Sequence, residues 1–230
     1  ANLLSDITMD GDGSNLQGNI YLINGTVNLN GYELSNIRSV TNCYGSISVM
    51  GPGTLTNYGW SQSSASANFT TSGSPDIAVN DGQFIMSNGS FNAGSATLDI
   101  NHNLTLTGGT LTVSSDTTYI ARSFDHTTAG VFNHNSGTVI FDGSSNGRVL
   151  MPSSLQTFYN VTISKTGSIF YIYAENDVMK IEGDLIFNTG STTSWGSKYN
   201  TFEVQGDVTA LTSFTTAGVY NTLLLTGTAN

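Results

Sequence analysis

The sequence predicts an all-β protein folded as a parallel β-helix, or β-solenoid, of about eight coils. The first observation is a recurring tripeptide, Gly-Thr-apolar, which occurs in four copies. The distance in sequence from the first copy to the second equals that from the third to the fourth, and the distance from the second to the third is twice as long. Its copies are Gly25-Thr26-Val27, Gly53-Thr54-Leu55, Gly109-Thr110-Leu111 and Gly137-Thr138-Val139. The second observation is that short segments with alternating apolar residues recur along the whole chain. A fixed period of about 28 residues in a chain of strands and turns is typical of solenoids.

We expect each repeat to form one coil, stacked about 4.8 Å from the next. The apolar residue of each tripeptide should then point inward in one column on one face. These residues are Val27, Leu55, Leu111 and Val139. The alternative fold is an antiparallel β-sandwich, because Asn-Gly turns also close hairpins. The fixed period favours the coils.

The alternating segments of the first half are expected strands. They are residues 19–23, 26–30, 46–50, 54–57, 76–80, 83–87, 97–100, 103–107, 110–113 and 118–122. The second half adds residues 130–133, 138–142, 148–151, 158–164, 168–173, 178–187, 202–208 and 219–226. Gly, Asn and Asp clusters separate them, and these residues adopt the positive φ of tight turns. We expect one domain, residues 1–230, with loops leaving the solenoid at 61–74 and 191–198 because both stretches are small and polar.

Charged residues make up only 10% of the chain, the net charge is −10, and Lys and Arg together number six. A nucleic acid or an anionic membrane surface is therefore not an expected partner, because no basic stripe is present to bind phosphates. No apolar run reaches the roughly 18 residues of a membrane span, so we expect no membrane insertion. Ala1 would suit the residue after a signal-peptide cleavage site, which suggests export. The single cysteine, Cys43, is expected to be a small buried side chain, with a crosslink between subunits as the alternative.

The central region contains three short sequence motifs. They are N-L-T-L at 103–106, G-T-V-I-F-D-G at 137–143 and F-Y-N-V-T-I at 158–163. Residues 99–187 resemble repeats of adhesin-like or hemagglutinin-like β-solenoid proteins from bacterial and archaeal cell surfaces. The resemblance implies a secreted, elongated protein that is not an enzyme. Such repeats usually belong to much longer proteins, so this chain is expected to be a piece of one or to reach length by polymerising.

Carboxylates are the first candidates for catalytic groups, because β-helix enzymes that cleave polysaccharides use them as acid and base. The densest pairs are Asp10/Asp12, Glu175/Asp177 and Glu182/Asp184. The sequence places no Lys, Arg or His at a neighbouring step, so we expect solvated surface carboxylates. We therefore predict no catalytic residues and no enzymatic activity.

The segment around Asp10 and Asp12 (D-G-D-G-S-N) resembles the start of a calcium loop. Tyr21 stands where an EF-hand would supply its closing Glu, so a plain Asp/Gly turn is the favoured interpretation. Asp10 and Asp12 are nevertheless the candidate metal ligands. The histidines, His102, His126 and His134, have no metal-ligand spacing. The phosphate-binding loop and the Rossmann fingerprint are absent from the sequence, so no cofactor is expected.

Two groups of residues are candidates for contact with sugars. Asn24, Asn68 and Asn88 stand in Asn-X-Ser/Thr triplets and are candidate glycosylation sites. Four aromatic residues flank or lie in the expected loops, where they could stack on a glycan, although packing in the core is the favoured interpretation. They are Tyr58, Trp60, Trp195 and Tyr199.

We therefore expect a secreted structural protein of the cell surface that self-assembles head to tail into an extracellular filament, sheath or stalk. Its partners would be copies of itself, with surface glycans as further candidates. Residues 219–226 carry three leucines and no charge, so this strand should add to the first coil of the next subunit, near residues 19–30. The contact would join Leu223 and Leu225 to Ile20, Leu22 and Val27. The alternatives are a glycan-binding adhesin or phage-tail segment and, less favoured, a polysaccharide lyase or hydrolase.

Overall fold

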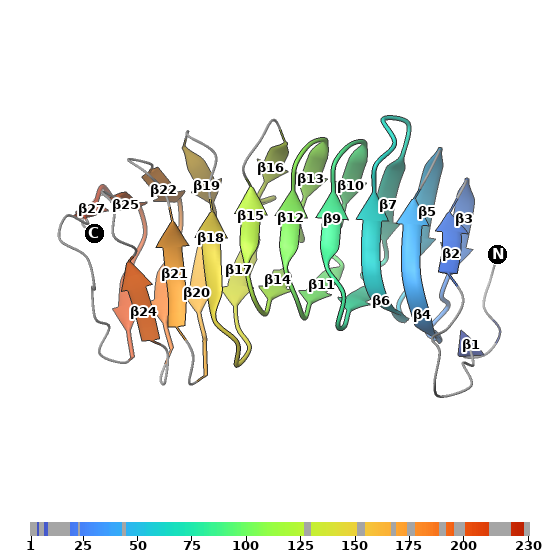
Figure 1. Cartoon of the computed structure of the whole chain (residues 1–230), viewed down its shortest axis with the longest axis horizontal. Helices are drawn as coiled ribbons and strands as arrows, with labels where there is room; N and C mark the ends of the chain where they lie inside the picture. The colour runs from blue at the N-terminus through green and yellow to red at the C-terminus, as the bar shows by residue number, and fades with distance from the viewer. Residues whose placement is uncertain are drawn as a thin grey trace.

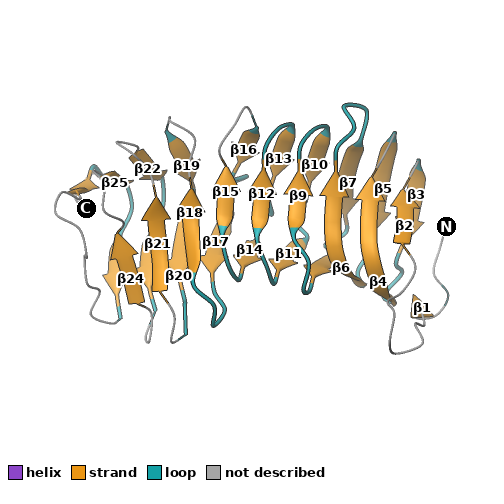
Figure 2. Ribbon diagram, viewed as in Figure 1, coloured by secondary structure: helices purple, strands orange, loops and turns teal. Residues whose placement is uncertain are grey.

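A computed structural model confirms the parallel β-helix. It describes residues 4, 7–8, 19–22, 24–42, 45–126, 130–150, 155–166, 169–173, 178–188, 192–195, 201–211 and 222–227. Within these residues the regular structure is all strand, with no helix (Figure 2). All pairings among the described strands are parallel, so the antiparallel sandwich is excluded. The coils stack side by side along the long axis (Figure 1).

Each coil contributes strands to three faces. The first face contains β1 (Ile7–Thr8), the first halves of β4 (Glu33–Asn42) and β6 (Thr54–Gln62), β8 (Asp76–Val79), β11 (Thr97–Ile100), β14 (Thr117–Ile120), β17 (Thr138–Phe141), β20 (Asn160–Ile163), β23 (Leu185–Phe187) and β26 (Val208–Ala210). The second contains β2 (Asn19–Leu22), the second halves of β4 and β6, β9 (Phe84–Met86), β12 (Leu104–Leu106), β15 (Phe124–His126), β18 (Gly147–Leu150), β21 (Ile169–Tyr173) and β24 (Thr192–Trp195). Because β4 and β6 run through both faces, they join them into one sheet.

The third face is divided into two sheets. The first contains β3 (Gly25–Asn28), β5 (Ser46–Met50), β7 (Asn68–Ser72), β10 (Ser90–Asn92), β13 (Thr110–Thr112) and β16 (Val131–Asn133). The second contains β19 (Gln156–Phe158), β22 (Val178–Ile181), β25 (Thr201–Val204) and β27 (Thr222–Leu225). Both sets occupy the same place in the coil, between a second-face strand and a first-face strand. Because β16 and β19 are not paired within the described residues, the third face is interrupted there.

Most of the coils are shorter than predicted. Leu98 pairs with Thr118 on the next coil, Val161 pairs with Leu185, and Phe124 pairs with Val149. These pairings correspond to coils of roughly 20–25 residues, so the longer predicted period is wrong.

The tripeptide copies do not share one face. Two of them stand at the start of third-face strands, β3 and β13, and two stand at the start of first-face strands, β6 and β17. Leu55, Leu111 and Val139 are buried and Val27 packs against the core. The predicted inward direction is therefore confirmed, but the predicted single column is wrong.

The spacing of neighbouring coils explains why glycine precedes these strands. A Cβ at Gly109 would lie 2.6 Å from the carbonyl oxygen of Gly89 on the adjacent coil. A Cβ at Gly137 or Gly53 would collide in the same way with the carbonyl oxygen of Ser114 or Tyr32. In these three copies the tripeptide thus marks a turn that passes close to the neighbouring coil, whereas at Gly25 a Cβ would meet nothing within 4 Å and the φ of 129° is what favours glycine. The tripeptide does not mark one step of the solenoid.

The predicted loop at 61–74 is wrong for half of its residues, which belong to strands of the coils. Residues 61 and 62 end β6, residues 68–72 form β7, and β7 pairs with both β5 and β10. Phe69 of β7 is fully buried. It meets Trp60 edge-on with ring centroids 4.8 Å apart and stacks on Phe91 at 4.6 Å. This large ring anchors an otherwise polar segment in the core.

The second predicted loop, 191–198, is also wrong where the structure describes it. Residues 192–195 form β24, which pairs in register with β21 through contacts such as Ile169↔Thr192. The main-chain ladder holds this segment in the coil although its side chains are mostly small and polar. Residues 191 and 196–198 lie outside the described residues.

Candidate functional site

The strand β27 ends an apolar column of the interior. Leu223 is in register with Phe202, and Leu225 with Val204. Phe202 and Val204 are 1% and 0% exposed, whereas Leu223 and Leu225 are 39% and 62% exposed. Among the described strands, β25 is the only partner of β27, so its other edge is unpaired there. This edge therefore presents core-type side chains and main-chain hydrogen-bonding groups together.

The strand β3 lies at the opposite end of the stack (Figure 1). Its residues Gly25 and Val27 are in register with Ile47 and Val49 of β5, whose side chains are buried in the core. An apolar cavity of about 20 Å³ lies inside these first coils, lined by Val27, Leu29, Leu34, Ile37, Val40, Val49 and Leu55. The interior is thus apolar but incompletely filled at this end.

The structure separates the predicted contact residues between two faces. Val27 lies in β3 on the third face, which is also the face of β27. Ile20 and Leu22 lie in β2 on the second face, and their side chains are outside the described part of the chain. Of the residues predicted at this end, Val27 is therefore the one on the face that matches Leu223 and Leu225.

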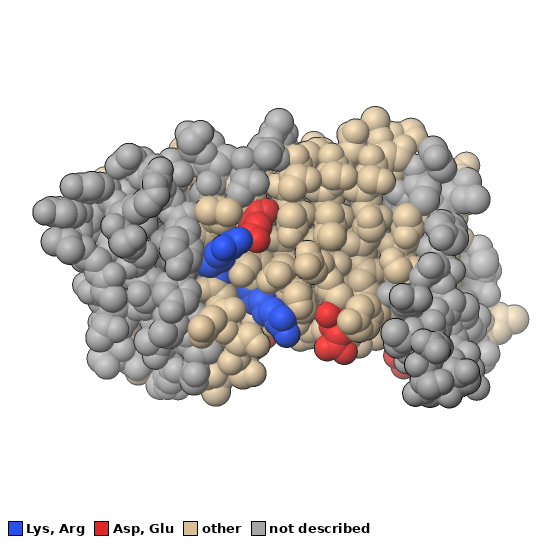
Figure 3. All heavy atoms as spheres, in the orientation of Figure 1, with Lys and Arg blue, Asp and Glu red and all other residues tan. Residues whose placement is uncertain are grey.

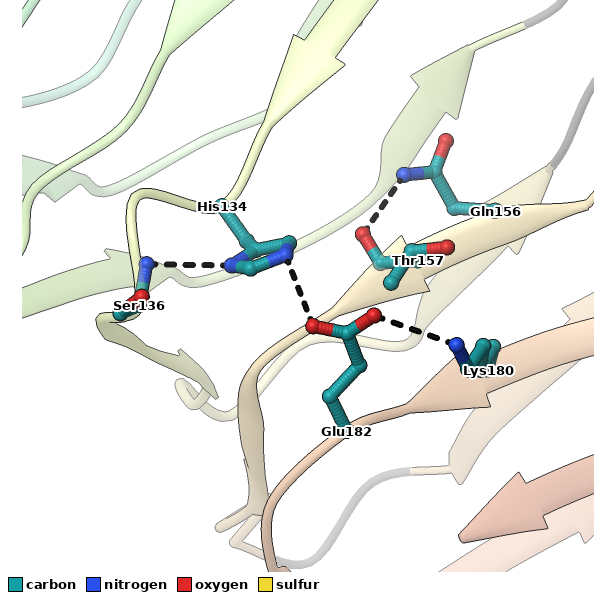
Figure 4. A network of polar contacts seen from close by, with 6 residues as sticks. All are labelled: His134, Ser136, Gln156, Thr157, Lys180 and Glu182. Carbon is teal, nitrogen blue, oxygen red and sulfur yellow. Dashed lines mark hydrogen bonds and ion pairs between the residues drawn. The ribbon is translucent and has the colours of Figure 1, made fainter. Parts of the chain in front are cut away.

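A polar network crosses the interruption in the third face (Figure 4). The Glu182 carboxylate, just after β22, lies 3.5 Å from His134 Nε2 and 3.2 Å from Lys180 Nζ. The backbone N–H of Ser136 donates to His134 Nδ1 at 3.0 Å. A neutral His134 ring therefore carries its proton on Nε2, where it faces Glu182. The ring also stacks on Tyr159, with centroids 5.9 Å apart.

This network links coils on both sides of the interruption. His134 follows β16, the last strand of the first sheet, whereas Lys180 lies in β22 of the second sheet and Glu182 directly follows that strand. Nearby, His126 lies between Gln156 Oε1 and the carbonyl oxygen of Gly130, each 2.7 Å from a ring nitrogen. The side chains supply polar contacts where the main-chain ladder is interrupted.

The expectation that Glu182 has no basic neighbour is wrong. Lys180 is two residues earlier on the same side of the strand, a signal that the sequence did contain. The position of His134 depends on how the coils stack, so the sequence offered no such signal. Asp184 has a different partner, because its Oδ1 accepts a hydrogen bond from the backbone N–H of Asp207 at 2.9 Å. Glu182 and Asp184 thus have separate partners.

A buried lysine occupies a turn between the first and second faces, a feature that the sequence did not reveal. Lys165 is fully buried, and its Nζ donates to the carbonyl oxygens of Ala121 at 2.5 Å and Ser145 at 3.3 Å. Burial lowers the pKa of Lys165 to about 8, although the Asp142 carboxylate opposes this shift. Burial also raises the pKa of Asp142, whose buried Oδ1 has no hydrogen-bond partner among the described residues. The cluster holds neighbouring turns together.

The described residues contain no group of three or more His, Cys, Asp or Glu side chains arranged to hold a metal. The histidines have separate partners; His102 Nε2, for example, lies 2.7 Å from Arg122 Nη1. Burial, with Arg122 adding to it, lowers the pKa of His102. The candidate metal ligands Asp10 and Asp12, the carboxylates Glu175 and Asp177, and Cys43 lie outside the described ranges.

The residues considered for sugar contacts differ in exposure. Trp60 is 1% exposed and stacks on Phe84 in the core, whereas Tyr58 is 44% exposed. Trp195 lies in β24 without a described side chain, and Tyr199 is outside the described ranges. Among the glycosylation triplets, Asn24 and Asn88 are exposed. Asn68 lies in β7, half-buried, and its Oδ1 accepts a hydrogen bond from Ser90 Oγ at 2.6 Å.

Charged side chains are sparse on the described surface that faces the viewer in Figure 3. One bidentate pair, Arg148 with Asp125, joins β18 to β15 through N–O distances of 2.9 and 3.1 Å. Within the described ranges, no helix is long and apolar enough to cross a membrane. Comparisons with known protein families, with curated proteins and with solved structures found no match to this chain.

Proposed function

We propose that this chain is a secreted structural protein without enzymatic activity, whose subunits join end to end into an extracellular filament. The observation that carries this proposal is the edge of β27, where an inward-facing column of the core ends in exposed leucines. In a monomer such an edge exposes apolar surface and unpaired main-chain groups to water. In a polymer the same edge is a joint.

The joint continues the third face from β27 of one subunit to β3 of the next. Because inward residues must remain inward, Leu223 would lie over Gly25 and Leu225 over Val27. Space is open at Gly25, where a Cβ would meet no described atom within 4 Å. Main-chain hydrogen bonds would extend the parallel ladder. Complete burial of each leucine would contribute about 1.5–3 kcal/mol.

The two contact surfaces are different and lie at opposite ends of the stack (Figure 1). A contact between unlike surfaces builds an open chain of subunits when its rotation does not close a ring. A low content of charged residues supports this form of assembly, because like charges in register would repel along the ladders. The resemblance to cell-surface β-solenoid repeats is the reason for proposing an extracellular location.

Substitutions in β27 test the joint. We expect Leu223→Lys with Leu225→Lys to abolish filaments in negative-stain micrographs and to leave monomers in sedimentation velocity. The matched control is Leu224→Lys, which changes the same strand on its outer side, beside Glu203. This control should still assemble. Filaments of normal length from the double variant, or equal loss of assembly in the control, would place the joint elsewhere.

A further inference from the structure

The geometry points to a binding site for a neutral, linear polysaccharide in a groove on the second face. The groove is shallow and largely open to solvent, has a volume of about 360 Å³ and lies across β4, β6 and β9. It is lined by Ser39, Tyr58, Gly59, Trp60, Ser61, Gly82, Gln83 and Ile85. Tyr58 and Ile85 are 44% and 38% exposed, so an aromatic and an aliphatic side chain are both available to a ligand.

Gly59 and Gly82 both line the groove, and the structure constrains the two positions differently. A Cβ at Gly82 would lie 2.5 Å from the carbonyl oxygen of Tyr58 and 2.9 Å from its ring carbon Cδ1. The backbone of Gly82 therefore lies against the Tyr58 ring and helps to fix its position. Packing thus requires glycine at residue 82.

Gly59 has no comparable constraint. A Cβ there would make only ordinary contacts, 3.6 Å from the carbonyl oxygen of Gln83 and 3.7 Å from Gly82 Cα. Its φ is not among the positive values that favour glycine. A side chain at residue 59 would be compatible with the fold but would occupy the groove beside Tyr58. A ligand in the groove gives glycine a role at this position that packing does not.

The lining residues define the chemistry of that ligand. None of the eight is charged, which favours a neutral molecule over an acidic sugar or a phosphate. The exposed surface of the groove is mainly apolar: Tyr58 offers a ring face and Ile85 an aliphatic surface, and the small polar part comes from a lining that includes Ser39, Ser61 and Gln83. A pyranose ring has apolar C–H faces and a rim of hydroxyl groups, and it matches this combination.

The form of the groove favours a chain over a single sugar. It lies on the outside of the solenoid, where it takes residues from three successive coils, β4, β6 and β9. A small ligand gains affinity by being enclosed on most sides, and an open surface groove does not enclose it. A polysaccharide can lie along the surface and make repeated weak contacts. This proposal does not depend on end-to-end assembly, although a filament would repeat the groove once per subunit and add avidity.

The test is an NMR titration of the protein with cellohexaose, mannohexaose and chitohexaose, with oligogalacturonate as the acidic comparison. We expect at least one neutral hexasaccharide to shift amide signals at residues 58–61 and 82–85. Tyr58→Ala should weaken that binding about tenfold by removing the ring face. Gly59→Val should weaken it at least as much by filling the groove. The control is Tyr32→Ala, a tyrosine that is 36% exposed and does not line the groove, and its binding should match the wild type.

Several outcomes would overturn the site. They are the absence of shifts with all three neutral sugars, equal binding of oligogalacturonate, and wild-type affinity in Gly59→Val. The unshifted amide signals of each variant report whether it is folded. If Tyr58→Ala fails to fold, the affinity of Gly59→Val is the test of the site. We expect this variant to fold, because a Cβ at residue 59 makes only ordinary contacts.

Discussion

Leu223 lies directly beside Phe202 in the parallel ladder of the third face, so the two side chains project to the same side of the sheet. Phe202 is 1% exposed, whereas Leu223, on the last described strand of this sheet, is 39% exposed. Equivalent positions of neighbouring coils thus differ in exposure: Phe202 is buried in the core, and Leu223 is on the surface. Exposure at the end of a solenoid follows from the absence of a covering coil among the described residues, and it is reversible when another coil is added.

This relationship predicts unequal costs for two truncations in the isolated subunit. Phe202→Ala should lower the free energy of unfolding by about 3–5 kcal/mol, because it opens a cavity in a closed core. Leu223→Ala should cost less than about 1 kcal/mol, because its side chain remains partly in water. Urea unfolding at a concentration where the protein is monomeric measures both. Equal losses would mean that Leu223 is already covered in the subunit.

A second prediction concerns the turn glycines. Gly137→Ala should lower the free energy of unfolding by about 1–3 kcal/mol, because the new Cβ collides with the carbonyl oxygen of Ser114 and the coils must separate. Gly59→Ala should change it by less than about 0.5 kcal/mol, because its Cβ has ordinary contacts. Thermal unfolding of both variants provides the comparison. A larger loss at Gly59 than at Gly137 would contradict the close approach of the coils.

The class of fold could be predicted from the sequence because alternation of apolar residues follows from the geometry of a strand. The alternation predicts strands at residues 46–50 and 97–100 with the same bounds that the structure has for β5 and β11. It misses β7 because Phe69 is the one apolar residue of that strand, flanked by Asn and Thr, so the segment resembles a polar loop. Its place in the sheet is set by main-chain pairing with the neighbouring coils, which the sequence does not display.

The coil length could not be obtained from the tripeptide, because glycine is required wherever two turns approach closely. Gly109 and Gly137 meet this condition on different faces, so their spacing combines a whole coil with the step between faces. The leucines of β27 could be predicted as an apolar strand from residues 219–226. The contact of His134 with Glu182 could not, because it depends on where the third face is interrupted.

A third prediction concerns the network at this interruption. Glu182→Gln should lower the free energy of unfolding by no more than about 1 kcal/mol, because its partners are partly exposed and solvent screens the charges. The loss should shrink further in about 1 M salt, where the screening length is short. Urea unfolding of wild type and variant at low and high salt measures this. A loss that is large and independent of salt would show that Glu182 supports the interruption by packing and not by charge.

The fourth prediction concerns Lys165 and pH. The folded protein holds the pKa of Lys165 at about 8, against 10.5 for an ordinary lysine. Between these values the unfolded chain binds more protons than the folded protein, so stability should rise as the pH rises through this window. Lys165→Met removes the titrating amine and leaves the carbonyl oxygens of Ala121 and Ser145 without this donor, which should cost about 1–3 kcal/mol at pH 7.

The difference in stability between wild type and Lys165→Met is the measurement that isolates this amine and its interaction with Asp142, because groups that do not interact with Lys165 titrate equally in both proteins. Below pH 8 the buried amine is charged in both folded and unfolded protein, so the penalty of burying a charge reduces the advantage of the wild type. Towards pH 10 the folded protein holds a neutral amine, and the penalty disappears. Urea unfolding at intervals from pH 7 to about pH 10 should therefore show the advantage of the wild type growing with pH. Parallel curves would mean that burial does not depress the pKa of this lysine, and that its hydrogen bonds to the neighbouring turns hold it in the charged form.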